Sequence, residues 1–129
     1  MAPKPTVTIS DAESRVMDAL WQRAPQSAEE IVALLQPLTG WHEKTVKTLL
    51  NRLLGKRAVS AQKDGRRYLY LPLLQREQWQ RHESRSLLDR VFGGRVAPLL
   101  VHFSQHEKLS AKDIAELRKL LDAIDKKGR

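Results

Sequence analysis

The feature that most constrains the fold is an amphipathic helix pattern over residues 43–54, followed closely by the pattern of a β-hairpin. Apolar residues recur at helical spacing within the first segment, at Val46, Leu49, Leu50 and Leu53. Residues 59–62 and 67–71 then read as two strands on either side of Asp64-Gly65, a dipeptide that tolerates the positive φ angles of a tight turn. A helix that leads into a short hairpin predicts a winged helix.

Two capping-box patterns place companion helices before this segment. Ser10 with Glu13 and Ser27 with Glu30 have the spacing in which the serine and the acid each cap the helix start. We expect the first helix to end near Ala24, before Pro25, and the second to be ended by Pro37 and the Thr39-Gly40 turn. A short strand over residues 24–26 is expected beside the hairpin. The third helix should end at Gly55 in a left-handed conformation, with Lys56 and Arg57 complementing its negative end.

The charge of the chain favours a polyanionic partner. Lys and Arg number 23 against 15 Asp and Glu, and most of the excess lies between Thr39 and Leu71, with eight basic and two acidic residues. The polar side of the third helix carries residue types that can contact phosphates or base edges. The alternative is that this polar side is a solvated face without DNA contacts. Trp41 can equally belong to the hydrophobic core. The predicted DNA contacts are Trp41, His42, Lys44, Thr45, Lys47, Thr48, Asn51 and Arg52 on the helix, with Lys63 and Arg66 on the wing.

Beyond Pro72 the sequence returns to helices whose apolar residues are too few for a stable core of their own. The simplest way to bury these apolar residues is against a second copy of the chain. The alternative is that the helices fold back on their own winged helix. The expected fold is therefore mostly α with a small β-hairpin wing: a winged helix-turn-helix domain over 7–72 and an α-helical dimerisation region over 73–127. The predicted dimer contacts are Leu87, Val91, Leu99, Leu100, Phe103, Leu117, Leu120, Leu121 and Ile124.

Several functional classes are disfavoured. The sequence has no phosphate-binding glycine loop and no hydrolase or zinc-protease motif, so we do not expect an enzyme or a cofactor. It has no cysteine and no membrane-length apolar run, which makes a cytoplasmic protein the default. His102 and His106 lie four residues apart and form a weak candidate for surface metal binding, but two histidines are fewer than a structural site needs, so no metal is expected.

Three separated motifs together resemble the penicillinase-repressor family of bacterial winged-helix repressors, of the BlaI, MecI and CopY type. They are residues 9–13 (Ile-Ser-Asp-Ala-Glu), Trp41 with residues 44–53, and residues 63–66 with Tyr68, Tyr70 and Pro72. The resemblance covers residues 9–121. It implies a homodimer that binds a palindromic double-stranded operator and represses transcription, as in regulators of antibiotic resistance. The alternative is a winged helix used for protein contacts without specific DNA binding.

The resemblance also implies how repression could be relieved. In the β-lactam-responsive members a protease-type antirepressor pathway leads to a cut before a Phe in the dimerisation region, which would be the His102-Phe103 bond here. The well-known members have Asn at the position of His102, so this chain departs from their pattern. The copper-responsive members use a cysteine motif, which this chain lacks.

Overall fold

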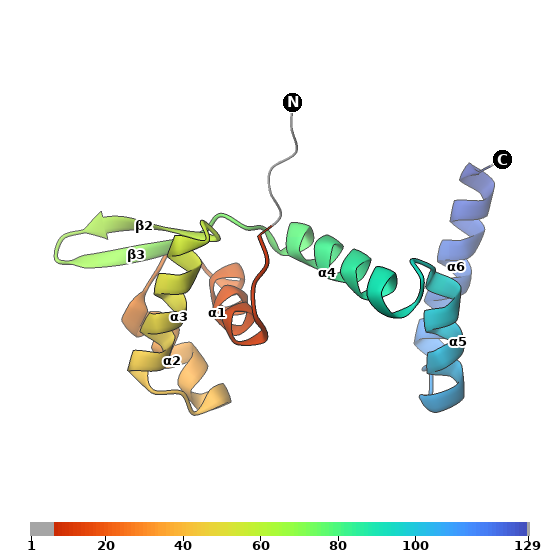
Figure 1. Cartoon of the computed structure of the whole chain (residues 1–129), viewed down its shortest axis with the longest axis horizontal. Helices are drawn as coiled ribbons and strands as arrows, with labels where there is room; N and C mark the ends of the chain where they lie inside the picture. The colour runs from red at the N-terminus through yellow and green to blue at the C-terminus, as the bar shows by residue number, and fades with distance from the viewer. Residues whose placement is uncertain (1–6, 129) are drawn as a thin grey trace. The chain divides into compact units, whose positions relative to one another are not determined.

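The computed structural model describes residues 7–128. The chain forms two compact units, of which the first ends at Glu83 and the second begins at Ser84. Figure 1 shows the order of the elements, which are α1 (Asp11–Gln22), β1 (Gln26–Ser27), α2 (Ala28–Thr39), α3 (Glu43–Gly55), β2 (Val59–Asp64), β3 (Arg67–Pro72), α4 (Arg76–Val91), α5 (Val96–His106) and α6 (Ala111–Lys127).

Both expected capping boxes form. At the start of α1, Ser10 Oγ accepts from the Glu13 N–H (3.1 Å) and Glu13 Oε1 accepts from the Ser10 N–H (2.7 Å). Ser27 and Glu30 repeat the arrangement at the start of α2. These reciprocal bonds satisfy backbone donors that a helix start leaves free, which is why the two helices begin where the sequence predicts.

The expectation that the Thr39-Gly40 turn ends the second helix is confirmed, whereas the expectation that Pro37 helps to end it is wrong. Helix α2 continues through Pro37 to Thr39, and Gly40 caps it with a φ of 70° and an N–H bond to the Gln36 carbonyl (2.9 Å). Pro37 lies in the last turn on the exposed side, where water can satisfy the carbonyl whose backbone partner proline removes. The left-handed glycine, rather than the proline, therefore sets the end of this helix.

The end of α3 also differs from expectation. Gly55 remains helical, and the left-handed residue is Arg57, with a φ of 61°. The Ala58 N–H bonds to the Leu53 carbonyl (2.9 Å) and the Arg57 N–H to the Leu54 carbonyl (3.1 Å), which is the bonding of a Schellman motif. Ala58 and Leu53 are both fully buried. This hydrophobic contact pulls the chain inward two residues after the point that the glycine suggested.

A three-stranded antiparallel sheet completes the first unit. Its order is β1-β3-β2, and the two long strands project as a hairpin away from the three helices (Figure 1). Asp64 pairs with Arg67, so the two loop residues are Gly65 and Arg66 rather than Asp64-Gly65. Gly65 has a φ of 64° and Arg66 a negative one, the pattern of a type II′ turn. The short strand also lies slightly later than expected, at Gln26–Ser27 instead of residues 24–26.

The start of α4 belongs to the first unit because a tryptophan pair packs there. The rings of Trp21 and Trp79 lie 5.4 Å apart, and the Trp21 indole N–H donates to the Leu74 carbonyl (2.8 Å). The Arg76 guanidinium lies over the Trp21 ring at 5.5 Å, within the range of a cation–π contact. These contacts explain why the first unit extends beyond the last strand.

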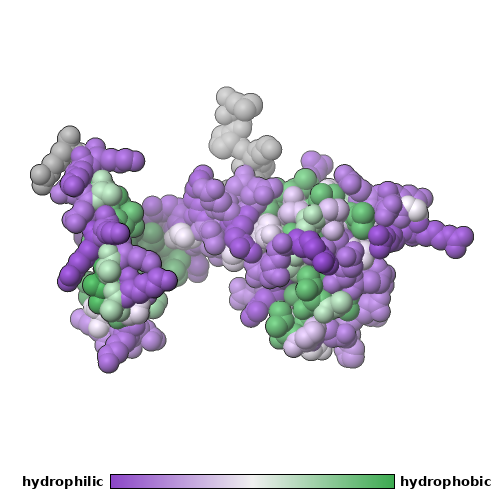
Figure 2. All heavy atoms as spheres, turned by 180° about the vertical axis from the view of Figure 1, so that it is seen from behind, coloured by the Kyte–Doolittle hydropathy of each residue, from purple (hydrophilic) through white to green (hydrophobic). Residues whose placement is uncertain are grey.

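The second unit comprises the end of α4 with α5 and α6, and none of these helices contains a buried residue. Its large apolar side chains are half-buried or exposed, and Figure 2 shows apolar groups on the surface of α5 and α6. Ser110 caps α6 by accepting from the Asp113 N–H (3.0 Å). The observed architecture confirms the expected fold class, a mostly helical chain with a small hairpin wing.

Candidate nucleic-acid interface

One side of helix α3 packs against the hydrophobic core, and the opposite side is exposed. Four of its apolar residues, Val46, Leu49, Leu50 and Leu53, are buried in the core with α1 and α2. The polar residues predicted to contact DNA are all exposed, namely His42, Lys44, Thr45, Lys47, Thr48, Asn51 and Arg52. Burial of one side fixes the helix rotation, so the opposite side is presented as a defined surface.

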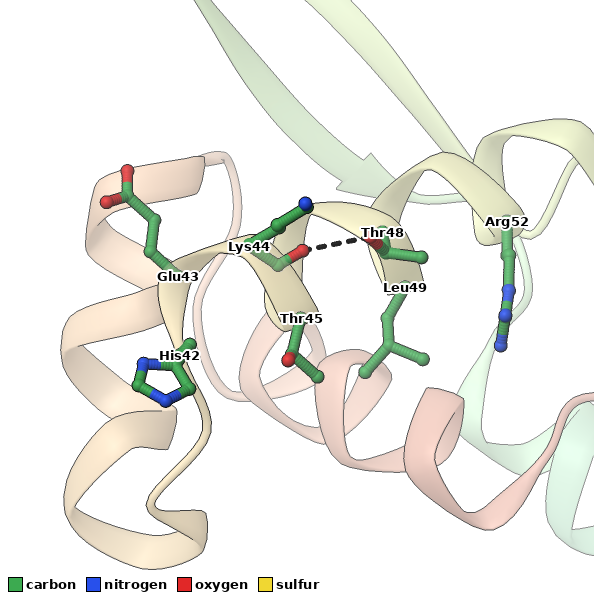
Figure 3. Close-up of a pocket in the computed structure, with 7 residues that line it drawn as sticks. All are labelled: His42, Glu43, Lys44, Thr45, Thr48, Leu49 and Arg52. Atoms are coloured by element: carbon green, nitrogen blue, oxygen red, sulfur yellow. Dashed lines mark hydrogen bonds between the residues drawn. The ribbon is translucent and has the colours of Figure 1, made fainter.

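Two open depressions lie along this exposed side. The first is lined by His42, Glu43, Lys44, Thr45, Thr48, Leu49 and Arg52 (Figure 3), and the second by Glu43, Lys44, Lys47, Thr48 and Asn51. The seven predicted helix contacts with exposed side chains are thus brought together. Trp41 is half-buried and packs against the core, although the sequence left its role open. It supports the start of the helix from inside.

The Thr48 hydroxyl is engaged within the helix. It donates to the Lys44 carbonyl at 2.9 Å, the bond drawn in Figure 3. Because the hydroxyl hydrogen is used within the helix, an outside partner is left with the γ-methyl and with the hydroxyl oxygen as an acceptor. A methyl group suits contact with the methyl of thymine in the major groove.

Glu43 is a member of this surface that the sequence reasoning missed. It lies in the first turn of α3, and Lys47 Nζ is 2.8 Å from its Oε1, with the side chains 57% and 49% exposed. The hydrogen bond and the charge of Glu43 raise the pKa of Lys47. The signal was present in the sequence as a Glu with a Lys four residues later, a spacing that brings such side chains together on a helix.

The wing carries the remaining predicted contacts. Lys63 lies on β2 opposite Tyr68, and Arg66 lies in the turn; both are exposed. Neither lines the depressions on α3. Arg67 pairs with Asp64 at 3.4 Å, which offsets part of the positive charge at the tip. The wing therefore offers Lys63 and Arg66 as cations separate from the helix surface.

A buried carboxylate anchors the far end of α3. Lys56 Nζ lies 2.6 Å from Glu13 Oε1 and 3.0 Å from the Thr8 carbonyl, so its ammonium binds α1 and the segment before it. The Glu13 side chain is only 2% exposed. Burial raises the pKa of Glu13, but the hydrogen bonds from Lys56 and Ser10 outweigh it and leave the pKa lowered. The ion pair joins three segments of the first unit.

The residues predicted for dimerisation and cleavage lie in the second unit. Leu99, Leu100 and Leu117 are half-buried, and the other predicted dimer residues are exposed, with Leu120, Leu121 and Ile124 each more than half exposed. His102 and Phe103 are exposed on α5.

The rings of His102 and His106 are 4.7 Å apart, but among residues 7–128 no group of three or more His, Cys, Asp or Glu could hold a metal ion. Within the same residues no helix is long and apolar enough to cross a membrane.

Comparison with known proteins gives a consistent match. Residues 9–123 match the family described as "Penicillinase repressor". The chain is 32% identical to the penicillinase repressor of Bacillus licheniformis, covering 88% of this chain and 89% of that protein, and 33% identical to the penicillinase repressor of Staphylococcus aureus, covering 94% and 96%. It is also 32% identical to the methicillin resistance regulatory protein MecI of Mammaliicoccus sciuri, covering 91% and 95%.

Solved structures agree for the first unit. The DNA-binding domain of the repressor BlaI matches with a TM-score of 0.53 and 33% identity, over 59% of this chain and 93% of that one. Monomeric BlaI of Bacillus licheniformis in complex with the blaP half-operator matches with a TM-score of 0.51 and 32% identity, over 57% and 90%. The similarity thus includes a protein whose structure was solved on DNA.

Proposed function

The chain belongs to the penicillinase-repressor family, whose named relatives are repressors rather than enzymes, and on this premise we propose that it is a dimeric repressor that binds a palindromic operator. The observation that carries the proposal is the exposed side of α3, where the polar residues gather over a helix fixed by its buried side. A helix presented in this way fits the major groove, whose base edges carry the sequence information. The wing cations supply contacts to the phosphate backbone.

Dimerisation is supported by the second unit. Its helices bury no residue, yet they carry exposed apolar side chains of the kind that a second copy covers. A symmetric dimer places two copies of α3 on two half-sites, which multiplies the limited selectivity of one helix. The proposed contacts are the nine residues named above, from Leu87 to Ile124.

Release of repression is the third part of the proposal. A cut between His102 and Phe103, made by a protease-type antirepressor in response to a cell-wall antibiotic, would divide α5 and weaken the dimer. The bond lies between two exposed residues. Mass spectrometry of the chain from cells treated with a β-lactam tests this part, and an intact chain in cells that show induction would refute it.

DNA binding itself is tested by fluorescence anisotropy with the DNA upstream of the chain's own gene. At physiological salt we expect a preference of about a thousandfold or more over a scrambled duplex, as is usual for specific binders. We also expect affinity to fall steeply with salt, by about 0.9 log unit per log unit of salt for each phosphate contact. Equal affinity for both duplexes would refute specific binding. Absence of any salt dependence would favour a role in protein contacts instead.

A further inference from the structure

We propose that Glu43 and Lys47 act together as a reader of one G·C base pair in each half-site. The inference rests on the proposed function, because it assigns a specific task to two residues of the same DNA-binding surface. Lys47 was expected to contact DNA from the sequence, whereas Glu43 was not. In the free chain the ion pair holds the two side chains together at one edge of the surface.

The position of the pair favours contact with bases. The N-terminal residues of a recognition helix are the ones that reach base edges, and Glu43 lies in the first turn of α3 with Lys47 one turn later. Glu43 lines both depressions on the exposed side, and Lys47 lines one of them. Figure 3 shows that Glu43 projects from the side of the helix opposite Thr45 and Leu49. The pair therefore occupies one edge of the surface, and Thr45 lies toward the other.

The chemistry of the pair matches a G·C base pair. In the major groove guanine presents two adjacent acceptors, N7 and O6, and cytosine presents the N4 amino donor beside them. An ammonium can donate to the guanine acceptors while a carboxylate accepts from the cytosine amino group. In an A·T pair the adenine amino donor replaces the guanine O6 acceptor, and the thymine O4 acceptor replaces the cytosine amino donor that the carboxylate would contact. The same side chains therefore fit A·T poorly.

The energetics permit this exchange of partners. Both side chains are about half exposed, and an ion pair of this kind contributes little to stability, so separating it to contact bases costs little. The negative charge of Glu43 also repels phosphate, which keeps Lys47 from serving as a general backbone contact. The pair is thereby suited to discriminate between bases and poorly suited to bind DNA irrespective of its sequence.

The test is selection from a random duplex pool with the purified full-length chain, followed by measurement of affinity for every single-base variant of the selected site. Three proteins are compared with the unaltered chain: Glu43→Ala, Lys47→Ala and the control Glu77→Ala. Glu77 is a matched control because it also lies in the first turn of a helix and pairs with a cation four residues later, Arg81, outside the DNA-binding surface. Tryptophan fluorescence on unfolding verifies that each variant is folded.

We expect both Glu43→Ala and Lys47→Ala to lose discrimination at the same G·C position, by at least about fivefold, because a good base contact distinguishes bases by about five- to 150-fold. Glu77→Ala should keep the full profile. Three results would overturn the inference: an unchanged profile for Glu43→Ala, loss at different positions for the two variants, or equal strengthening of binding to every sequence. If the unaltered chain selects no sequence at all, the proposed function fails instead, so the two failures are distinguishable.

Discussion

The buried pair of Glu13 and Lys56 provides the sharpest prediction about stability. Replacing Lys56 by Met keeps most of the length of the side chain but removes the ammonium that lies 2.6 Å from Glu13 Oε1. The carboxylate, 2% exposed, would then keep only its hydrogen bonds with Ser10. Breaking a buried ion pair from one side costs about 3–5 kcal/mol. Lys56 is 40% exposed, and we therefore expect a smaller loss of unfolding free energy, about 2 kcal/mol at pH 7, since water screens part of the interaction.

The sign of the pH dependence follows from the lowered pKa of Glu13. A carboxyl group with a lowered folded-state pKa stabilises the fold above its unfolded pKa, and this contribution is lost as the pH falls through the folded-state value. In Lys56→Met the opposing effect of burial remains, so the carboxyl protonates more readily. The difference between the unaltered chain and the variant should therefore shrink as the pH falls below the ordinary range of a Glu side chain.

The assay is urea unfolding followed by tryptophan fluorescence. All three tryptophans, Trp21, Trp41 and Trp79, lie in the first unit, so the signal reports that unit. Lys63→Met is the matched control, because Lys63 is an exposed lysine of the same unit and has no ion pair among the described residues. A loss below about 0.5 kcal/mol in Lys56→Met at pH 7, the usual range for surface substitutions, would refute the reasoning. A loss that stays equal at acidic pH would refute the role assigned to the carboxylate.

Four further outcomes are expected. Thr48→Ser, which keeps the hydroxyl but not the methyl, should lower base preference at one position severalfold while Thr48→Val retains it; equal single-base affinity profiles for the two variants would remove the methyl from the reading. Lys63→Ala should weaken binding to all duplexes alike and reduce the salt slope by about 0.9, as expected for one phosphate contact, so a change confined to one base would contradict that role. Leu117→Asp places a charge among the proposed dimer contacts and should give monomers in sedimentation; a persisting dimer would place the interface elsewhere. Arg57→Gly should raise the unfolding free energy by about 1 kcal/mol in denaturant titration, because a left-handed φ is costly for residues other than glycine, and a loss of stability would show that the Arg57 side chain contributes more than its backbone costs.

Local patterns predicted most of the fold. The capping boxes at Ser10 and Ser27 involve residues three apart, and both formed as the spacing indicated. The helical period of the apolar residues in α3 identified its buried side without error. Features of this kind depend on neighbours in the chain, and so the sequence displays them directly.

The errors arose where burial or a contact outside the local sequence pattern determines the structure. Gly55 looked like the end of α3, but the burial of Ala58 against Leu53 moved the left-handed residue to Arg57. The sequence pattern linked Lys56 only to its own helix and did not indicate its bonded partner Glu13, which lies 43 positions away in the chain. The polar side of one helix was enough to predict which side chains of α3 are exposed together, although their contact with DNA stays a prediction. Glu43 was missed because an acid was not expected among residues that bind a polyanion.

The packing of Trp79 on Trp21 has a practical meaning for anyone who dissects this chain. A fragment that stops after the last strand would carry Trp21 without Leu74 or Trp79, and so would leave a large indole ring facing water and its N–H without the Leu74 carbonyl. A fragment that continues to Glu83 retains both contacts. The smallest piece worth expressing as an independent DNA-binding protein is therefore set by the covering of one tryptophan rather than by the end of the sheet.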